Sequence, residues 1–201
     1  MTKAKEIDVA DPQDVLDFWL TELTQKDWYM GGADLDATCL VRFGGTWAAL
    51  KAGKLEDWRS GPQTILAYIL LADQLSRNMH RDTAEAFATD GLARAAAKQA
   101  IGKGWDKRVS GPERQFFYMP LTHSECAMDQ ESAVRKFCRD MPKSDNNLLH
   151  ARAHREVIRM FGRFPARNVA LGRKSSKAEQ AYVDGKGYAD LLEKFRVTEP
   201  T

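Results

Sequence analysis

The stretch PQTILAYILLADQLSR, residues 62–77, decides the fold of this chain. Its apolar residues from Ile65 to Leu75 occupy every side of a helix, which is the pattern of a helix that is buried all round. Gly61-Pro62 places a proline at the first helical position, where its fixed φ suits the helix and its missing N–H is not needed. We therefore expect a central buried helix over 62–77, with the rest of the chain packed around it.

The rest of the chain is also biased toward helix. Ala and Leu together number 44, against 14 for Val and Ile. Unbranched side chains lose little rotamer freedom in a helix, whereas β-branched ones favour strands. No stretch alternates apolar and polar residues between hairpin signals, so we expect no strands.

Periodicity and helix-start signals predict eight helices, the last one broken at Gly185 or Gly187. Their expected ranges are 12–26, 34–52, 62–77, 83–101, 112–119, 124–140, 146–161 and 176–195. Connections are short and no low-complexity linker interrupts them, so we expect a single all-helical domain over residues 1–201. Antiparallel pairs of this kind form either a bundle or a solenoid, and the sequence shows no 34-residue repeat that would decide between them.

The composition is typical of a soluble globular protein, with 43% hydrophobic and 29% charged residues and a net charge of +2 over 201 residues. This balance excludes a strongly basic nucleic-acid binder and an acidic disordered chain. The longest apolar run, Ile65–Ala72, is far shorter than the about 20 residues of a membrane span, and the first residues hold no apolar segment of a secretory signal. Cys39, Cys126 and Cys138 form no CxxC pair. We therefore expect reduced thiols, a cytoplasmic location and no membrane association.

Polar residues emerge at the end of the buried helix, at Asp73, Gln74, Arg77, Asn78 and Arg81. Charged groups at such a junction must be paired or must line a cavity, because burial of an unpaired charge is costly. This junction is the first candidate site.

Other polar residues lie on apolar helix faces: Gln130 in 124–140, Asp90 in 83–101, and His150 with His154 in 146–161. Each by itself is most often a hydrogen-bonded core residue. The two histidines share a face at i,i+4 spacing, but an alanine follows the first where HExxH has an acid, and no third ligand is identifiable. We therefore expect no metal, and no phosphate or dinucleotide motif points to a cofactor.

The segment PLTHSE, residues 120–125, leads into the helix expected over 124–140. Ser124 suits an N-cap and Glu125 suits the positive end of the helix dipole. Helix capping does not account for His123, and histidine is the side chain best suited to proton transfer near neutral pH.

The near-zero net charge hides an uneven distribution. Residues 1–40 hold nine acidic and three basic residues, whereas residues 157–178 hold six basic residues and no acidic one. Within the basic stretch, GRFPARN, residues 162–168, cannot be a regular helix through Pro165. It predicts a rigid turn that presents Arg163, Arg167 and Asn168. Arginine forks bind carboxylates and phosphates of ligands. Alternatively, these arginines stabilise the fold by pairing with Asp73, Asp90, Glu125 or the acidic N-terminal helix. The stretch has no interleaved aromatic platform, so we do not expect nucleic acid as a partner.

Three motifs in the same order resemble the bacterial family known as domain of unknown function 924. They are DQLSRNMHR (73–81), PLTHSE (120–125) with Gln130, and FGRFPARN (161–168) followed by LGR (171–173); DFW (17–19) and Trp58 are similar as well. The resemblance covers roughly residues 12–185, and Leu75 and Ala166 depart from it where the family has Phe and often His. It implies an all-helical, tetratricopeptide-like superhelix of about eight to nine helices and implies no activity.

Three hypotheses follow for function. The first is a cleft for an anionic small molecule or a peptide carboxylate on the helical scaffold. The second is a hydrolase or transferase with His123 as general acid or base, oriented by Glu125 or Asp73, and arginines that stabilise negative charge. The third is a purely structural polar network on a scaffold that binds a protein partner. The proposed catalytic residues are His123 and Glu125, and the proposed ligand-binding residues are Asp73, Arg77, Asn78, Arg81, Gln130, His154, Arg163, Arg167, Asn168 and Arg173.

Overall fold

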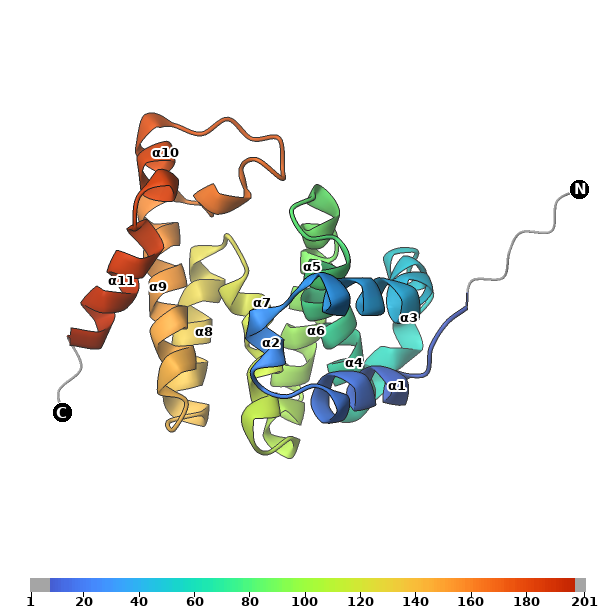
Figure 1. Cartoon of the computed structure of the whole chain (residues 1–201). Coiled ribbons are helices and arrows are strands. Elements are labelled where there is room, and N and C mark those ends of the chain that lie inside the picture. The colour runs from blue at the N-terminus through green and yellow to red at the C-terminus, as the bar shows by residue number, and fades with distance from the viewer. Residues whose placement is uncertain (1–7, 198–201) are drawn as a thin grey trace, which may run out of the picture. The chain divides into compact units, whose positions relative to one another are not determined.

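The chain is all-helical in the part that the structure describes, residues 8–197 of a computed structural model, and that part contains no strand (Figure 1). The α-helices are α1 (Pro12–Asp17), α2 (Asp27–Met30), α3 (Ala33–Lys51), α4 (Pro62–Ile69), α5 (Ser76–Met79), α6 (Asp90–Gly102), α7 (Met119–Thr122), α8 (Ala127–Asp140), α9 (Asp145–Phe161), α10 (Lys177–Asp184) and α11 (Gly187–Val197). Within residues 8–197 these are eleven α-helices, more than the eight or nine expected, because three of them are four-residue helices.

The chain divides into two compact units, Met1–Phe117 and Tyr118–Thr201. The expectation of a single domain concerns cooperative folding, and it stays a prediction. The residues at which a secretory signal would begin, 1–7, lie outside the described part. No helix of the described residues is long and apolar enough to span a membrane.

The first unit is built around the helix predicted from residues 62–77. Helix α4 passes through a π-helical segment, Leu70–Leu75, into α5, so the chain winds continuously from Pro62 to Met79. Residues 65–72 are at most 1% exposed, which confirms the buried helix. Helices α1 and α6 pack against α4, and α3 packs against α5.

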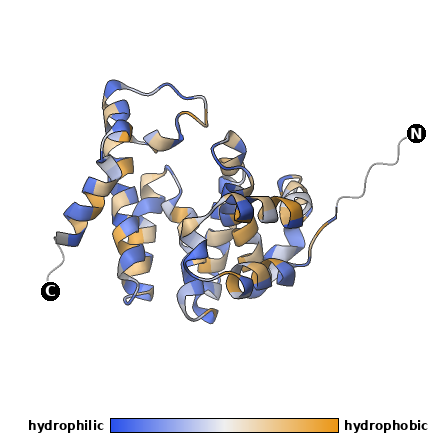
Figure 2. Cartoon of the chain, in the orientation of Figure 1, coloured by the Kyte–Doolittle hydropathy of each residue, from blue (hydrophilic) through white to orange (hydrophobic). Residues whose placement is uncertain are grey.

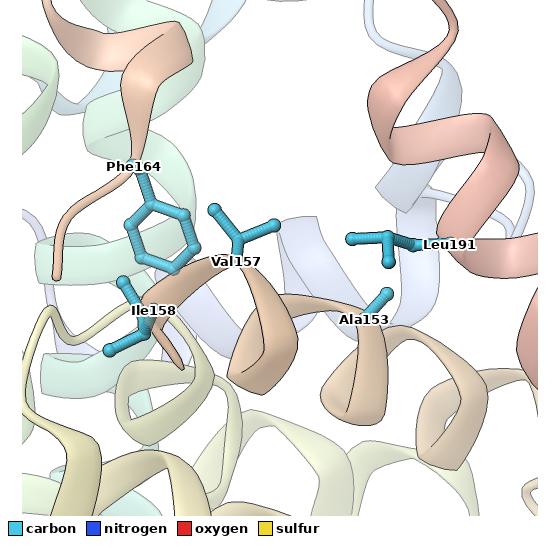
Figure 3. Packing of buried hydrophobic residues seen from close by; sticks show 5 residues of the cluster. All are labelled: Ala153, Val157, Ile158, Phe164 and Leu191. Atoms are coloured by element: carbon cyan, nitrogen blue, oxygen red, sulfur yellow. The ribbon is translucent and has the colours of Figure 1, made fainter. Parts of the chain in front are cut away.

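The second unit is a set of adjacent helices that follow one another along the chain. The turn at 141–144 brings α9 back along α8, α11 packs on α9, and α10 packs on α11 (Figure 1). Helices α8 and α9 carry both hydrophobic and hydrophilic residues, as amphipathic helices do (Figure 2). The apolar face of α9 gathers Ala153, Val157 and Ile158 with Phe164 and Leu191 into a buried cluster (Figure 3).

The predicted helix over 176–195 is indeed broken by the two glycines, since α10 ends at Asp184 and α11 begins at Gly187. The helix expected over 83–101 begins only at Asp90. The Thr89 hydroxyl donates to the Ala72 carbonyl oxygen (2.6 Å) and accepts from the Trp47 indole (3.2 Å). These buried bonds fix the chain in a non-helical conformation just before the helix.

Two other expected helices differ from the structure, one in its type and one in its start. Residues Pro112–Phe117 wind as a 3-10 helix, and the chain restarts as α7, where Pro120 supplies no N–H to continue an earlier α-helix. Helix α8 begins at Ala127 and not at 124. The Ser124 hydroxyl instead donates to the Asp129 carboxylate (2.8 Å) and accepts from the Cys126 N–H (3.2 Å).

Candidate functional site

The predicted site residues fall into two groups, one in each unit. The first unit holds Asp73, Arg77, Asn78 and Arg81, and the second unit holds His123, Glu125, Gln130, His154, Arg163, Arg167, Asn168 and Arg173. Each group is assembled from its own unit's elements. A common cleft of both groups stays a prediction.

Arg77 is the centre of the group in the first unit. Its guanidinium donates to the Asp73 carbonyl oxygen (2.6 Å) and to the Asp90 carboxylate (3.2 Å), and it lies 3.5 Å from the Asp73 carboxylate. Burial lowers the pKa of Arg77, but the charges of Asp73 and Asp90 outweigh burial and raise it. The π-helical segment places Asp73 in the core at 1% exposure, and Arg77 compensates its charge. This arrangement joins the central helix to the start of α6.

Arg81 and Asn78 face the start of α3. Arg81 forms a two-pronged ion pair with Asp36 (2.6 and 2.8 Å) and also donates to the Asn78 side-chain oxygen (3.0 Å). Asp36 lies in the first turn of α3, where the helix dipole favours an acid. Sequence reasoning identified the arginine but missed its partner, because 45 residues separate the two.

The basic turn in the second unit, residues 162–173, begins where α9 ends. Gly162 takes the left-handed conformation (φ 69°) that commonly ends a helix, and Pro165–Arg167 then form a short 3-10 turn. The sequence predicted this rigid, non-α turn, which we call the arginine turn.

Arg173 anchors the end of the arginine turn to Glu125. Its two terminal nitrogens donate to the two carboxylate oxygens (2.8 and 2.9 Å), and the Phe164 N–H donates to the same carboxylate (2.9 Å). Burial raises the pKa of Glu125, but the hydrogen bonds from Arg173 and Phe164 outweigh burial, so the pKa lies below its usual value. Glu125 therefore stays ionised and binds the turn.

Arg163 anchors the beginning of the turn to Glu179. Two guanidinium nitrogens donate to the carboxylate (2.5 and 2.8 Å), which also accepts the Ser176 N–H (2.7 Å). The hydrogen bond from Arg163 is the main cause of a strongly lowered pKa of Glu179. Sequence reasoning missed Glu179, although Ser176 and Glu179 have the S-x-x-E spacing of a capping box, which the structure contains.

Arg167 lies between these two anchors and near two histidines. It donates to the His123 carbonyl oxygen (2.9 Å), and its guanidinium lies 4.5 Å from the centre of the Phe164 ring. The His123 and His154 ring centres are 6.2 Å apart, and the ring of Phe164 lies 5.5 Å from that of His154. We call the half-buried side chains of His123, His154 and Arg167 the histidine–arginine surface.

The third histidine of this unit completes a row of rings. His150 Nδ1 and the Tyr188 hydroxyl are 2.8 Å apart, and the Tyr188 ring lies 5.5 Å from that of His154. Burial lowers the pKa of His150 and raises that of Tyr188. His150 and Tyr188 are thus joined by a hydrogen bond between two neutral groups. Three of the four histidines of the chain therefore gather in the second unit.

Gln130 and Asn168 are fully buried amides that hold the backbone around this surface. The Gln130 amide donates to the carbonyl oxygens of Thr122 (2.7 Å) and Ser124 (2.6 Å), and the Asn168 amide donates to the Ser175 hydroxyl (3.0 Å). The side-chain oxygens of both amides accept no hydrogen bond from residues 8–197. Both residues fix loops that carry the histidine–arginine surface.

No group of three or more His, Cys, Asp or Glu side chains within the described part of the chain is arranged to hold a metal ion. The i,i+4 histidines contact the tyrosine and phenylalanine rings described above. The histidine–arginine surface offers a guanidinium and two imidazoles to a ligand.

The comparisons with known proteins agree with the motifs. No curated protein matches the chain. A solved structure of a protein of unknown function from Agrobacterium tumefaciens is similar, with 36% identity and a TM-score of 0.81, over 87% of this chain and 97% of that one. The profile of DUF924, described as a bacterial protein of unknown function, matches residues 15–187. The chain therefore belongs to the DUF924 family.

Proposed function

We propose that the second unit binds an anionic small molecule or a peptide carboxylate at the histidine–arginine surface. The charge of the arginine turn is the observation that carries this proposal. Three arginines (Arg163, Arg167, Arg173) meet two carboxylates, those of Glu125 and Glu179. Residues 162–173 themselves hold these three arginines and no acidic residue, beside two half-buried imidazoles.

The contacts of the three arginines give them different roles in this proposal. Arg163 and Arg173 hold carboxylates of the chain with both prongs, so we assign them to positioning the turn. Arg167 donates from a terminal nitrogen to a neutral carbonyl oxygen, and its guanidinium lies over the Phe164 ring. A guanidinium carries five N–H donors in a planar fork, and this geometry suits a ligand carboxylate or phosphate. Neutral or protonated imidazoles of His123 and His154 add donors of the same kind.

In the wider form of the proposal, the helix pairs form a tetratricopeptide-like superhelix that presents this surface in a concave cleft. Asp73, Arg77, Asn78 and Arg81 then add to the polar lining, as the sequence predicts. Gln130 and Asn168 act through the loops that they hold. Cytoplasmic location and the absence of a cofactor belong to the same proposal.

A thermal-shift series with inorganic phosphate, citrate and a short peptide with a free C-terminus tests the proposal. The variants are Arg167→Ala and, as a matched control, Arg135→Ala, which removes an exposed arginine of α8 in the same unit. A ligand at about 100 times its Kd adds about 2.7 kcal/mol to the stability of the wild type. We expect this shift in the wild type and in Arg135→Ala, and its loss in Arg167→Ala. Equal shifts in all three proteins, or no shift with any probe, contradict the proposal.

The alternative of a protein-binding scaffold is favoured by apolar side chains that the second unit exposes. Val169, within the arginine turn, is 93% exposed, and Met128 and Met160 are 71% and 52% exposed. In this alternative the polar network is purely structural. It predicts that Arg167→Ala lowers stability in the absence of any probe and that Val169→Ser abolishes partner binding.

A further inference from the structure

The first unit contains a cavity that the anion proposal does not use. Its volume is about 480 Å³, within the range of small-ligand pockets. One wall is formed by residues 9–12, which lead into α1, and the other by residues of the segment 57–64, which leads into α4.

Both walls are held in place by the rest of the first unit. The Ala10 N–H donates to the hydroxyl of Thr46 (2.8 Å), a fully buried residue of α3. Asp11 caps α1 by accepting the Gln13 N–H (2.8 Å). On the other wall, Trp58 is 5% exposed within the 3-10 helix Glu56–Ser60. The cavity is therefore preformed, so a ligand need not order the walls.

The charge of the lining has one sign. Asp11 and Asp57 contribute carboxylates, and none of the lining residues is basic. Asp57 is exposed and makes no hydrogen bond or ion pair with residues 8–197. The neighbouring Arg59 does not neutralise it, because its guanidinium binds Glu56 (2.8 Å) and Gln99 (2.8 Å).

The helix ends beside the cavity reduce this negative charge without reversing it. Helices α1 and α4 begin at Pro12 and Pro62, and each N-terminus carries roughly half a positive charge. Two full carboxylates outweigh the two half charges. The field in the cavity therefore favours a cation.

Trp58 gives the cavity a second means of recognising such a ligand. Trp58 is one of the lining residues and is 5% exposed. An ammonium group is attracted to the face of an indole ring, and the apolar stem of an amine packs against the same ring. Ser60 and Thr64 add hydroxyl groups to the lining.

We propose that this cavity binds a small alkylammonium ligand, with Asp57 as its principal counter-charge and Trp58 as its aromatic wall. A hydrated divalent metal ion is a poorer fit, because the lining offers two carboxylates and no third acidic, histidine or cysteine ligand. An anion is excluded by the sign of the charge. The site is independent of the histidine–arginine surface and of its ligand.

The test is a binding titration with cadaverine at low ionic strength, followed by calorimetry and by tryptophan fluorescence. Pentanediol, which has the same chain length and no charge, is the neutral probe. Asp57→Asn removes the counter-charge from an exposed, unbonded position, so the variant folds. Asp34→Asn is the matched control, since it removes one negative charge from an exposed residue of the same unit outside the cavity.

We expect saturable binding of cadaverine to the wild type and to Asp34→Asn, and none of pentanediol. Asp57→Asn should weaken binding by about tenfold or more, the loss of one charged hydrogen bond. Trp58→Phe should abolish the fluorescence change while calorimetry still detects binding. Equal weakening in both Asn variants, tighter binding of Ca²⁺ than of cadaverine, or no saturation at about millimolar amine overturns the proposal.

Discussion

Replacement of Arg173 by alanine tests whether the arginine turn is held by the Glu125 ion pair. The change removes two charge-assisted hydrogen bonds, of 2.8 and 2.9 Å, and leaves the carboxylate with the bond from the Phe164 N–H. Breaking a fully buried pair costs about 3–5 kcal/mol. The two side chains are 24% and 29% exposed, so water partly replaces the lost partner. We expect a loss of about 2 kcal/mol, which lowers the midpoint of thermal unfolding by roughly 4–8 °C.

The tryptophans make the assay specific to one unit. All five lie between residues 19 and 105, in the first unit, whereas helices of both units contribute to circular dichroism. Urea unfolding of Arg173→Ala should shift the transition seen by circular dichroism. A matching shift in tryptophan fluorescence means that both units unfold together, which supports the predicted single domain.

A double-mutant cycle identifies the partner. Glu125→Gln alone and Arg173→Ala alone should each destabilise the protein, and the double variant should cost about 1 kcal/mol less than the sum. Arg135→Ala serves as the control for loss of a positive charge. If Arg173→Ala lies within about 0.5 kcal/mol of the wild type, the ion pair does not hold the turn.

Two further predictions concern protonation. Arg163 lowers the pKa of Glu179, so the contribution of this carboxylate to stability is complete above its unfolded pKa of about 4.3 and is lost as pH falls toward its folded pKa. Urea unfolding below about pH 4 should therefore show a smaller loss of stability in Arg163→Ala than in the wild type. Equal losses in the two proteins would contradict the pairing. Burial raises the pKa of Cys39 to about 12, whereas Cys126 and Cys138 are exposed. Mass spectrometry after iodoacetamide treatment of the folded protein should therefore find Cys126 and Cys138 alkylated and Cys39 modified only in urea. Rapid labelling of all three cysteines would show that the core around α3 opens readily.

Much of the fold could be predicted from sequence because its signals are local. The buried helix at 62–77 and the break between Gly185 and Gly187 follow from periodicity and from residues that end helices. The errors in the predicted helix bounds arose where groups far away in the sequence determine the backbone conformation. Thr89 is held outside α6 by Trp47 and Ala72, which lie far away in the sequence.

The sequence showed the arginines of the turn and offered Glu125 as one possible partner, but it did not identify Glu179. The basic turn was visible as a run of arginines without acids, but its acids lie at Glu125 and Glu179, outside that run. Charge counted in a window cannot reveal a counter-ion supplied by another element. The S-x-x-E pattern at 176–179 was the one local signal for Glu179, and it indicates a helix start without indicating that Arg163 binds there.

These pairings determine which substitutions separate binding from folding. Variants of Arg163 or Arg173 release a glutamate and a segment of the turn at once, so loss of ligand binding in them says little about ligand contact. Arg167 joins the turn to a carbonyl oxygen and to a ring, and its removal breaks neither two-pronged ion pair. Arg167→Lys sharpens the comparison, since lysine keeps the charge and loses the planar fork. A ligand that needs the fork should bind Arg167→Lys as weakly as Arg167→Ala, whereas a ligand attracted by charge alone should bind it as well as the wild type.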